Sequence, residues 1–384
     1  MPKHCWDLKN SDMMVRAKIV KGDGSNAVNA TDVSVVNNTL YSMFSQVDAF
    51  LDDKQISDSN PFLPYRCYLE NLLGYDADVH KGWMEKSAIF VKDTAAHFGD
   101  YARAGANTGL AARATIFQAS AMVDMFGRIP IDIAHQEQVM LDNSKLELRF
   151  IPSRDNYVLM SVAPAGTDAQ ELYKLKIVEM KLYVLTLEIS DAISLAISRK
   201  LEIDNARWFI NKTSLKIVTI PNGQSNIMQD NAYLGKLPKR LTIAFVTDAS
   251  MSGGYQQNPF NFGHFGLSQL GLNVNGNMVP NRPYTPDFTA NRYIREYMGL
   301  HEGLRMLFTN RAIDITYDEF RGGYAIFIFD LTQNKNGDEA PQLTGTLRIE
   351  GKFAAPLTAT IQMIMFAEFD SIIYKTKTEV ISPY

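Results

Sequence analysis

The sequence has few of the features that mark secreted or membrane proteins. Cysteine occurs only twice in 384 residues, at Cys5 and Cys67, which is too few for a disulfide framework and favours free thiols in a reducing compartment. No apolar run reaches the ~18 residues that a membrane span needs. The first fourteen residues also lack the apolar core of a secretory signal. These absences predict a chain without a membrane span that is made in the cell interior, in the cytoplasm or the nucleus.

The sequence also lacks a basic block. Lysine and arginine together number 38 against 42 aspartates and glutamates, which gives a net charge of −4. Proteins that hold nucleic acid through its phosphates present clustered positive charge. We therefore expect no direct, sequence-specific binding of nucleic acid.

Groups that could perform chemistry are scarce and scattered. The segment His301-Glu302-Gly303 lacks the second histidine of a zinc-protease helix, and Ser252-Gly253-Gly254-Tyr255 lacks the lysine of a phosphate-binding loop. The six histidines show no metal-ligand spacing: His4, His80, His97, His135, His264 and His301. We assign no catalytic residue, no cofactor-binding residue and no metal ligand, and the chain is predicted not to be an enzyme.

Two groups of residues suggest binding sites but have simpler explanations. The carboxylates of Asp48, Asp52 and Asp53 could hold a hard cation, although a solvated turn accounts for them better. Four aromatic residues and a histidine lie close together in the sequence: Tyr255, Phe260, Phe262, His264 and Phe265. They could stack on sugars or bases, but without basic neighbours we expect them to pack between subunits.

Short segments with period-two alternation dominate the chain. Leu146, Leu148 and Phe150 alternate with charged residues, as they do in a strand with one face in water. Segments 241–245 and 347–353 show the same pattern. All three are predicted to be strands with one wet face.

Three other segments are expected to form strands of a different kind. Segments 324–331 and 361–369 are apolar at nearly every position, which predicts strands buried on both faces. In segment 175–189 the alternation changes phase near Val178 and Glu179. Such a phase change indicates a β-bulge in one long strand.

Helical spacing of apolar residues is limited to four short pieces. Residues 40–47 and 65–73 are expected to form short helices or helical turns. Ser190 can cap a helix that runs to Leu201, and a further helix is expected over 291–308, with His301 partly buried on its apolar stripe.

Glycine, asparagine and proline cluster at four expected turns, 22–24, 221–223, 275–277 and 336–338. These residues tolerate the backbone angles of tight turns. A length of 384 residues fits two domains, and the helix near 190–201 is the best candidate boundary. The sequence thus predicts an all-β protein with two β-sandwich halves and a few short helices.

Several short segments, which lie in both halves of the sequence, together carry a family resemblance. They are VVNNTLYSMFSQVDAFLDDKQIS at 35–57, YRCYLENLLGY at 65–75, NTGL at 107–110, GKLPKRLTIAFV at 235–246, NPFNFGHFGLSQLGLNVNGNMVP at 258–280, GYAIFIFDLT at 323–332 and AEFDSIIY at 367–374. Together they resemble major capsid proteins of the double jelly-roll lineage of adenoviruses and tectiviruses, in particular those of Polinton/Maverick elements and related adintoviruses. Cys67 departs from this pattern, in which a small residue such as alanine is expected. The residues before Val28 match nothing in it.

The resemblance implies a double jelly roll, with two eight-stranded jelly-roll domains side by side. Residues 1–30 are then expected to form an N-terminal arm, 31–205 the first jelly roll and 206–384 the second. The loops at 74–110 and 250–262 are expected to lie at the outer surface.

The resemblance also implies a structural role. Three chains are expected to form a homotrimer with a pseudo-hexameric outline, which assembles further into the icosahedral capsid of a virus or virus-like element. The expected partners are copies of the chain itself and a penton or vertex protein, and the expected location is the virion capsid. The alternative is a minor or vertex capsid component, or a glycan-binding β-sandwich protein.

Overall fold

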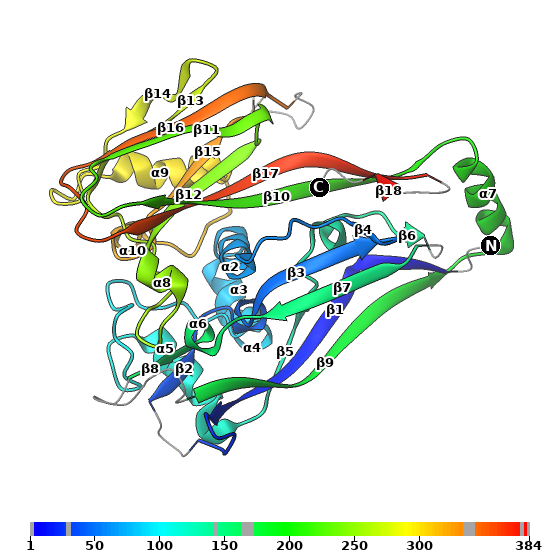
Figure 1. The fold of residues 1–384 in the computed structure, drawn as a ribbon, viewed down its shortest axis with the longest axis horizontal. Helices are drawn as coiled ribbons and strands as arrows, with labels where there is room; N and C mark the ends of the chain where they lie inside the picture. Colours follow the sequence, from blue (N-terminus) through cyan, green and yellow to red (C-terminus); the bar gives the residue numbers. More distant parts are fainter. Residues whose placement is uncertain are drawn as a thin grey trace.

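The computed structural model of the chain describes residues 4–27, 32–141, 144–162, 173–332, 342–376 and 380–381. The turn expected at 336–338 lies outside these residues. Within them, every strand pairs with strands on its own side of residues 190–205. We refer to the two sides as the first half and the second half, which lie one above the other in Figure 1.

The first half is built on one long antiparallel strand pair. β1 (His4–Lys21) pairs with β9 (Tyr173–Glu188) over almost its whole length. On its other side β1 pairs with β5 (Val123–Arg128) and β6 (Met140–Leu141). In this sheet β9 therefore lies at the edge.

Two smaller sheets complete the first half. β3 (Phe44–Leu51) pairs with β4 (Lys54–Gln55) and β7 (Leu146–Pro152). The short strands β2 (Val33–Val35) and β8 (Leu159–Ser161) form a separate pair.

The second half opens with a sheet in the order β10-β17-β12-β15. Its strands are β10 (Ala206–Ile220), β17 (Ile361–Lys375), β12 (Arg240–Thr247) and β15 (Ile326–Asp330). The short β18 (Val380–Ile381) pairs with the end of β17. In this sheet β17 is paired on both sides.

The other sheet of the second half has the order β11-β16-β13-β14. Its strands are β11 (Asn226–Lys236), β16 (Thr344–Phe353), β13 (Leu267–Val274) and β14 (Asn277–Tyr284). The expected turns at 221–223 and 275–277 lie between strands of this half, and the turn at 22–24 follows β1. A five-stranded and a four-stranded layer of this kind form a β-sandwich.

Helices are more numerous than the sequence suggested. Those of the first half are α1 (Thr39–Ser42), α2 (Leu63–Gly74), α3 (Ala77–Val79), α4 (Glu85–Ser87), α5 (Thr108–Ile116) and α6 (Asp155–Val158). Those of the second half are α8 (Asp248–Ser252), α9 (Ile294–Gly303) and α10 (Tyr317–Arg321). The halves are joined at the far end of the molecule by α7 (Asp191–Leu201), beside the N-terminus (Figure 1).

The two halves share the pairing of their long strands but differ in the segment that lies between the paired strands. In both, the first long strand pairs antiparallel with the last, as β1 with β9 and β10 with β17. β3 with β7 corresponds to β11 with β16. In the described part of the first half, however, helices occupy much of the chain between β3 and β7, where the second half forms β12 to β15. The described first half still contains nine strands, β1 to β9, but four of them span only two or three residues.

The expected N-terminal arm at residues 1–30 is wrong for the described residues 4–21, which form β1 in the main sheet of the first half. Met13, Val15, Ala17 and Ile19 alternate along this strand and are fully buried. From Val15 to Ile19 they alternate with the charged Arg16 and Lys18, a pattern that identifies a strand with one face on the core.

Several strand predictions are confirmed. β7 and β16 cover two of the alternating segments, and β15 and the first half of β17 are buried on both faces. The predicted bulge is also present, because Arg16 lies opposite Glu179 and Ala17 opposite Ile177, which leaves Val178 as the extra residue. β12 differs from its prediction: Leu241 to Val246 are all buried. The positions expected to face water hold Thr242, Ala244 and Val246, which carry no charge.

The helix predictions had a mixed outcome. α2 and α7 are confirmed, and the Ser190 hydroxyl accepts a hydrogen bond from the backbone N–H of Ile193. The helix expected over 40–47 is wrong beyond Ser42, because Phe44 begins β3 and pairs with β7. The helix expected over 291–308 is shorter and spans only α9.

Both cysteines are buried in the structure, and neither forms a disulfide. Burial in the core raises the pKa of the Cys67 thiol well above its usual value, so the reactive thiolate is suppressed. We predict that the disulfide reagent DTNB titrates no thiol in the native chain and two thiols per chain after denaturation. Titration of a thiol in the native chain at the rate of free cysteine would contradict this burial.

Candidate functional surface

The two halves meet through stacked aromatic side chains. The Tyr68 ring of α2 lies parallel to the Phe260 ring, with centroids 4.0 Å apart and an interplanar angle of 7°. Tyr65 meets Phe260 edge-on at 5.9 Å, and Phe262 packs against both tyrosines. All four side chains are fully buried. The expectation that Phe260 and Phe262 pack between subunits is therefore wrong, because they join the two halves of one chain.

The rest of this aromatic group is also held within the chain. The Tyr255 hydroxyl donates to the backbone carbonyl of Tyr173 at 2.9 Å. The His264 ring stacks on Phe288 at 4.1 Å, and burial lowers the pKa of His264, which favours the neutral imidazole. Phe265 is half-buried. The five residues do not form one surface on which sugars or bases could stack.

The two loops expected at the outer surface lie at this same junction. In the segment 74–110, Phe90 and Phe98 are buried, and the Ala96 N–H donates to the carbonyl of Gly322. In the segment 250–262, the carbonyl of Tyr255 accepts from Ser161 N–H. The abundance of glycine and tyrosine in these loops had suggested exposure, whereas their large apolar residues are buried between the halves.

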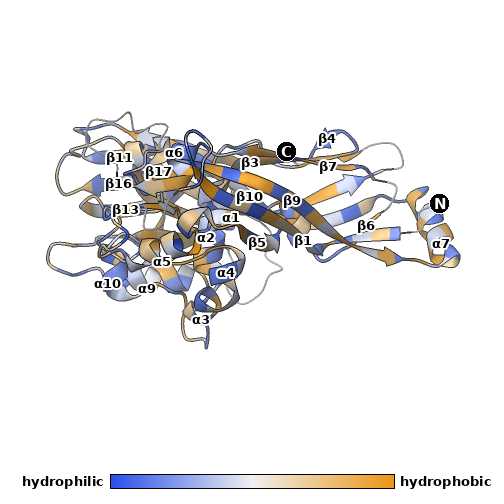
Figure 2. Cartoon of the chain, turned by 90° about the horizontal axis from the view of Figure 1, so that it is seen from below, coloured by the Kyte–Doolittle hydropathy of each residue, from blue (hydrophilic) through white to orange (hydrophobic). Residues whose placement is uncertain are grey.

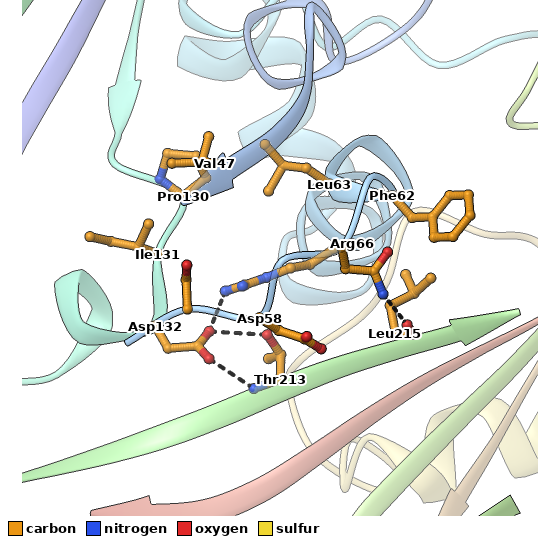
Figure 3. Close-up of a pocket in the computed structure, with 12 residues that line it drawn as sticks. Val47, Asp58, Phe62, Leu63, Arg66, Pro130, Ile131, Asp132, Thr213 and Leu215 are labelled. Carbon is orange, nitrogen blue, oxygen red and sulfur yellow. Dashed lines mark hydrogen bonds and ion pairs between the residues drawn. The ribbon is translucent and has the colours of Figure 1, made fainter. Parts of the chain in front are cut away.

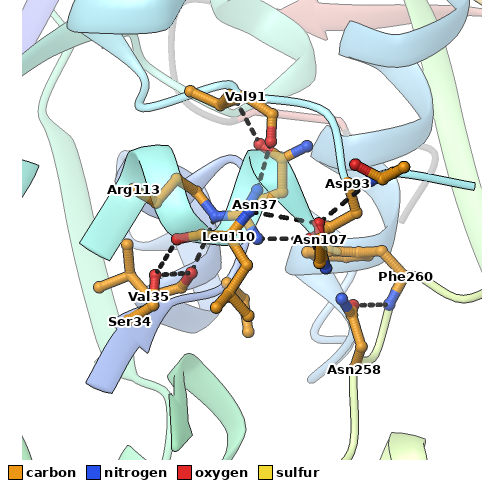
Figure 4. Close-up of polar contacts among 12 residues, drawn as sticks. Ser34, Val35, Asn37, Val91, Asp93, Asn107, Leu110, Arg113, Asn258 and Phe260 are labelled. Atoms are coloured by element: carbon orange, nitrogen blue, oxygen red, sulfur yellow. Dashed lines mark hydrogen bonds and ion pairs between the residues drawn. The ribbon is translucent and has the colours of Figure 1, made fainter. Parts of the chain in front are cut away.

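A buried ion pair fixes the first of these segments (Figure 4). Asp93 Oδ1 lies 2.6 Å from a terminal nitrogen of Arg113 and also accepts from Asn107 Nδ2 at 2.9 Å. Both charged side chains have no solvent exposure. Arg113 donates further to the carbonyls of Val35 and Val91. The Asp93 carbonyl accepts the hydroxyl of Tyr324, which ties the network to the second half.

A second buried carboxylate joins the halves around a small cavity (Figure 3). Asp132 pairs with Arg66 of α2 and accepts both the backbone N–H and the hydroxyl of Thr213 in β10, each at 3.0 Å. Arg66 also pairs with Glu70 at 3.0 Å. The cavity measures about 30 Å³, room for about one water molecule, so it is not a ligand site.

These contacts also cap the outer edge of β10. Besides the bond from Thr213, the Phe209 N–H donates to the side-chain carbonyl of Gln138 at 3.2 Å. The Leu215 carbonyl accepts from the Asn60 amide. Groups of the first half thus satisfy backbone groups on an edge that no described strand pairs with.

A third junction was not foreseeable from the sequence, because its members lie more than 200 residues apart. The buried His80 ring lies 3.0 Å from a carboxylate oxygen of Asp314, whose other oxygen pairs with Lys92 at 3.0 Å. Lys92 also pairs with Glu319 at 2.9 Å. Burial opposes ionisation of Asp314, but the bonds from His80 and Lys92 outweigh it and lower its pKa.

The other histidines do not converge on a site. His4, His97 and His135 are exposed. His301 is partly buried on α9, as expected, with Nδ1 3.1 Å from the carbonyl of Tyr297. Within the described ranges, no group of three or more His, Cys, Asp and Glu side chains could hold a metal ion.

The three carboxylates weighed as a cation site have separate partners. Asp48 accepts from Gln46 and Ser59, at 2.7 and 2.9 Å. Asp53 pairs with Lys145 at 2.8 Å, and Asp52 pairs with Lys375 of β17 at 2.6 Å. The aspartates therefore belong to a strand, a turn and a contact between the halves.

Exposed apolar side chains concentrate in one stretch of the chain. Of the 20 large hydrophobic residues that are exposed in the described part, ten fall between residues 178 and 209. We call them the β9–α7 surface: Val178, Met180, Leu182, Tyr183, Val184, Leu185, Leu187, Ile193, Ile203 and Phe209. Figure 2 shows β9 running toward α7 with alternating hydrophobic and hydrophilic positions. Exposed apolar surface gathered in this way marks an interaction site.

Part of this surface faces the inside of the first half. Met180 lies opposite Val15 and Leu182 opposite Met13 in the ladder. Directly paired residues point to the same face of a sheet, and Val15 and Met13 are fully buried. Met180 and Leu182 nevertheless remain 37% and 44% exposed. The core-facing row of β9 is thus left uncovered by the described residues.

A groove of about 830 Å³ opens between the halves beside α2. Tyr75, Trp83 and Phe126 line it together with the charged residues Arg240 and Glu368. The Trp83 ring is 56% exposed and meets Tyr75 edge-on at 5.7 Å. Trp83 and Tyr75 thus present aromatic surface in this groove to a small ligand.

Comparisons with known proteins identify the fold. The chain is similar to a chain of the Sputnik virophage structure (TM-score 0.60, 12% identity, 99% of this chain and 82% of that chain). It is similar to the Faustovirus major capsid protein (0.56, 7%, 98% and 86%) and to the mavirus major capsid protein (0.52, 9%, 99% and 84%). The chain therefore has the double jelly-roll fold. Two of these matched proteins are viral major capsid proteins, those of Faustovirus and mavirus.

Sequence comparison adds one relative. An uncharacterized protein of Caenorhabditis elegans is 23% identical over 349 residues, which are 88% of this chain and 78% of that protein. No protein-family model matches the sequence. No helix in the described part is long and apolar enough to cross a membrane.

The buried ion pair at the junction gives a stability prediction. Asp93→Asn removes the charge that compensates Arg113, and an unpaired buried charge costs about 3–5 kcal/mol. We expect a large decrease in the free energy of unfolding, measured by chemical denaturation. The matched control is Asp124→Asn, which breaks the exposed pair with Arg16 and should leave the midpoint unchanged. Equal midpoints for the two variants would contradict the role given to Asp93.

Proposed function

We propose that the chain is a major capsid protein of a virus or virus-like element. The observation that carries the proposal is the likeness of fold to viral major capsid proteins over 98 to 99% of the chain. The uncovered β9–α7 surface supports it, because a shell subunit must present apolar surface to its neighbours. The chain would act by self-assembly, with no cofactor and no catalytic step.

In this proposal three chains form a homotrimer with a pseudo-hexameric outline, and the trimers tile an icosahedral shell. Each half would supply one jelly roll, with the boundary near α7: residues up to about 205, β1 included, would form the first roll and 206–384 the second. Six similar rolls from three chains fit a hexagonal lattice, and closed symmetry gives each chain the same contacts. A penton or vertex protein would close the five-fold positions. The chain would be made in the host cell interior, in the cytoplasm or nucleus, and would reside in the virion capsid.

The sequence phrases that resemble those of Polinton/Maverick elements and adintoviruses support, in this proposal, an origin of the chain in such a virus-like element. The relative in Caenorhabditis elegans supports this origin, because it shows that such a sequence occurs in an animal. The long stretch of similarity to that protein covers both halves.

One observation favours a second candidate function. The exposed Trp83 beside Tyr75 in the groove of about 830 Å³ is suited to stacking on a sugar ring. A minor or vertex capsid component, or a glycan-binding β-sandwich protein, would use such a groove. These functions do not require the chain to assemble with itself.

The mass of the purified chain in solution distinguishes the two functions. Light scattering should give a species near three times 43.1 kDa, and negative-stain electron microscopy of the same sample should show hexagonal outlines or shells. A monomer that persists over a range of salt and protein concentrations would contradict the shell proposal. The glycan-binding alternative would then be tested by binding of sugars to the chain and to its Trp83→Ala variant.

A further inference from the structure

The long strand pairs that correspond between the halves, β1 with β9 and β10 with β17, differ in what covers their outer faces. In the second half, the Phe369 ring of β17 packs on Tyr233 of the other sheet at 5.6 Å. Its neighbour Glu368 therefore points to the outer face, because successive side chains of a strand alternate. Thr213 and Arg240 lie directly opposite Glu368 and share this face.

The first half of the same chain lies against this outer face. The Thr213 hydroxyl donates to Asp132 at 3.0 Å, as Figure 3 shows. Thr213, Arg240 and Glu368 also line the groove that runs beside α2. In the second half, the outer face of the β10–β17 pair is thus a surface on which another half of the molecule packs.

The corresponding outer face of β1 and β9 stays open to water in the described part of the chain. Met14 of β1 points to this face, because it alternates with the fully buried Met13 and Val15. Phe126 of β5 lies directly opposite Met14. The Tyr183 ring of β9 lies 5.9 Å from the Phe126 ring, and its hydroxyl lies 3.9 Å from Met14 Sδ. We call Met14, Phe126 and Tyr183 the Phe126–Tyr183 patch; the two rings are 44% and 49% exposed.

Paired charges surround this patch on the same face. Arg16 pairs with Asp124 at 2.6 Å and with Glu179 at 3.3 Å. Glu179 also pairs with Lys181 at 2.6 Å. An apolar, aromatic centre inside a polar rim is the usual anatomy of a protein–protein interface.

The second half carries an exposed aromatic side chain that suits such a patch. Phe308 is 97% exposed, and its φ of 59° lies in the left-handed region that a bulky residue rarely adopts. Backbone strain of this kind is concentrated at binding sites. The turn is anchored at its start, where Arg305 pairs with Asp330 at 2.9 Å. α9, which precedes the turn, exposes Ile294 and Met298 one helical turn apart.

We propose that the Phe126–Tyr183 patch binds the second half of a neighbouring copy of the chain, with Phe308 of that copy as the aromatic anchor. Exposed aromatic residues of this kind supply much of the binding energy of interfaces. The contact is heterologous, because each chain uses one surface of its first half and a different surface of its second half. Such contacts close into a ring when the rotation between copies allows it.

This inference rests on the proposed trimer of six similar rolls and names the surface that joins its chains. β1 and β10 both start at the α7 end of the molecule and run in the same direction (Figure 1). In a ring of six rolls, one step about an axis along the strands carries the first half onto the second. The next step carries the second half onto the first half of another chain. Every roll then keeps its strands parallel to the axis, and the outer face of β1 and β9 receives the cover that β10 and β17 receive within the chain.

Photo-cross-linking of the assembled full chain tests this contact directly. The photoreactive benzoylphenylalanine replaces Phe308, whose exposure makes the exchange compatible with the fold. Particles assembled from nitrogen-15-labelled and unlabelled chains distinguish cross-links between copies from those within one chain. We expect a product of twice 43.1 kDa, with the cross-link between copies in peptides that contain residues 12–16, 123–128 or 179–183. The same probe at Met228, which is 70% exposed on β11, is the matched control and should give at least about fivefold less of this product.

Substitutions test the contact independently of the probe. Phe308→Asp and Tyr183→Asp each place a charge in the apolar centre of the interface. Each should raise the protein concentration at which half of the chains are monomeric by about tenfold or more, measured by light scattering. Met228→Asp, the matched control, should leave this concentration unchanged. Circular dichroism establishes that each variant is folded, and Phe308→Asp decides the matter if Tyr183→Asp does not fold.

The outcomes separate this contact from the proposed function. Cross-links from position 308 that map elsewhere on the second chain would overturn the contact. An unchanged three-chain species in the folded Phe308→Asp variant would do the same, and both results would leave the proposed function standing. A wild-type chain that stays monomeric would contradict the proposed function and this contact together.

Discussion

The open edge of β9 is the constraint on which this structure depends. A long strand must pair the backbone groups of both edges or expose them to water, and an exposed apolar edge invites another strand. The second half meets this requirement within the chain, because β12 covers β17 and side chains of the first half cap β10. In the first half β1 is the strand paired on both sides, and the described residues leave β9 at the edge of its sheet. The outer edge of β9 thus stays without a partner strand among the described residues.

Buried contacts between the two halves fix how the halves pack against each other. Stacked rings of Tyr68 and Phe260, the pair of Asp93 with Arg113 and the contact of Asp132 with Thr213 lie in the same interior. Ionic groups buried at this depth stabilise one arrangement because any other leaves a charge unpaired. The second half is therefore held against the inner side of the first half, and β9 stays at the rim of the molecule.

Local patterns in the sequence were sufficient for much of the fold. Alternation identified β7, β16 and the core strands β15 and β17, and a phase change identified the bulge at Val178. The same pattern in Met13 to Ile19 would have identified β1, which was instead assigned to an arm because nothing in it resembled a known phrase. The predicted bounds of the helices at 40–47 and 291–308 were wrong, because apolar spacing over one or two turns fits a helix and a strand equally well.

The sequence could not show which residues, far apart along the chain, lie close together in the fold. Glycine- and tyrosine-rich segments were taken for outer loops, but their aromatic residues meet α2 in the interior, and the contact of His80 with Asp314 spans 234 positions. The candidate surface escaped notice for the same reason. β9 was recognised as a long strand, but whether a second strand covers its edge depends on partners that lie elsewhere in the chain.

Hydrogen–deuterium exchange tests most directly whether assembly covers β9. The exchange of backbone amides in 173–188 would be compared between the dilute chain and the assembled particles, with the fully buried β12 as an internal reference. The account predicts that exchange along the centre of β9 slows on assembly by about tenfold or more, because its outer amides gain partners, while exchange in β12 stays unchanged. Equal exchange of β9 in the dilute and assembled chain would contradict the account, because assembly would then leave this edge open.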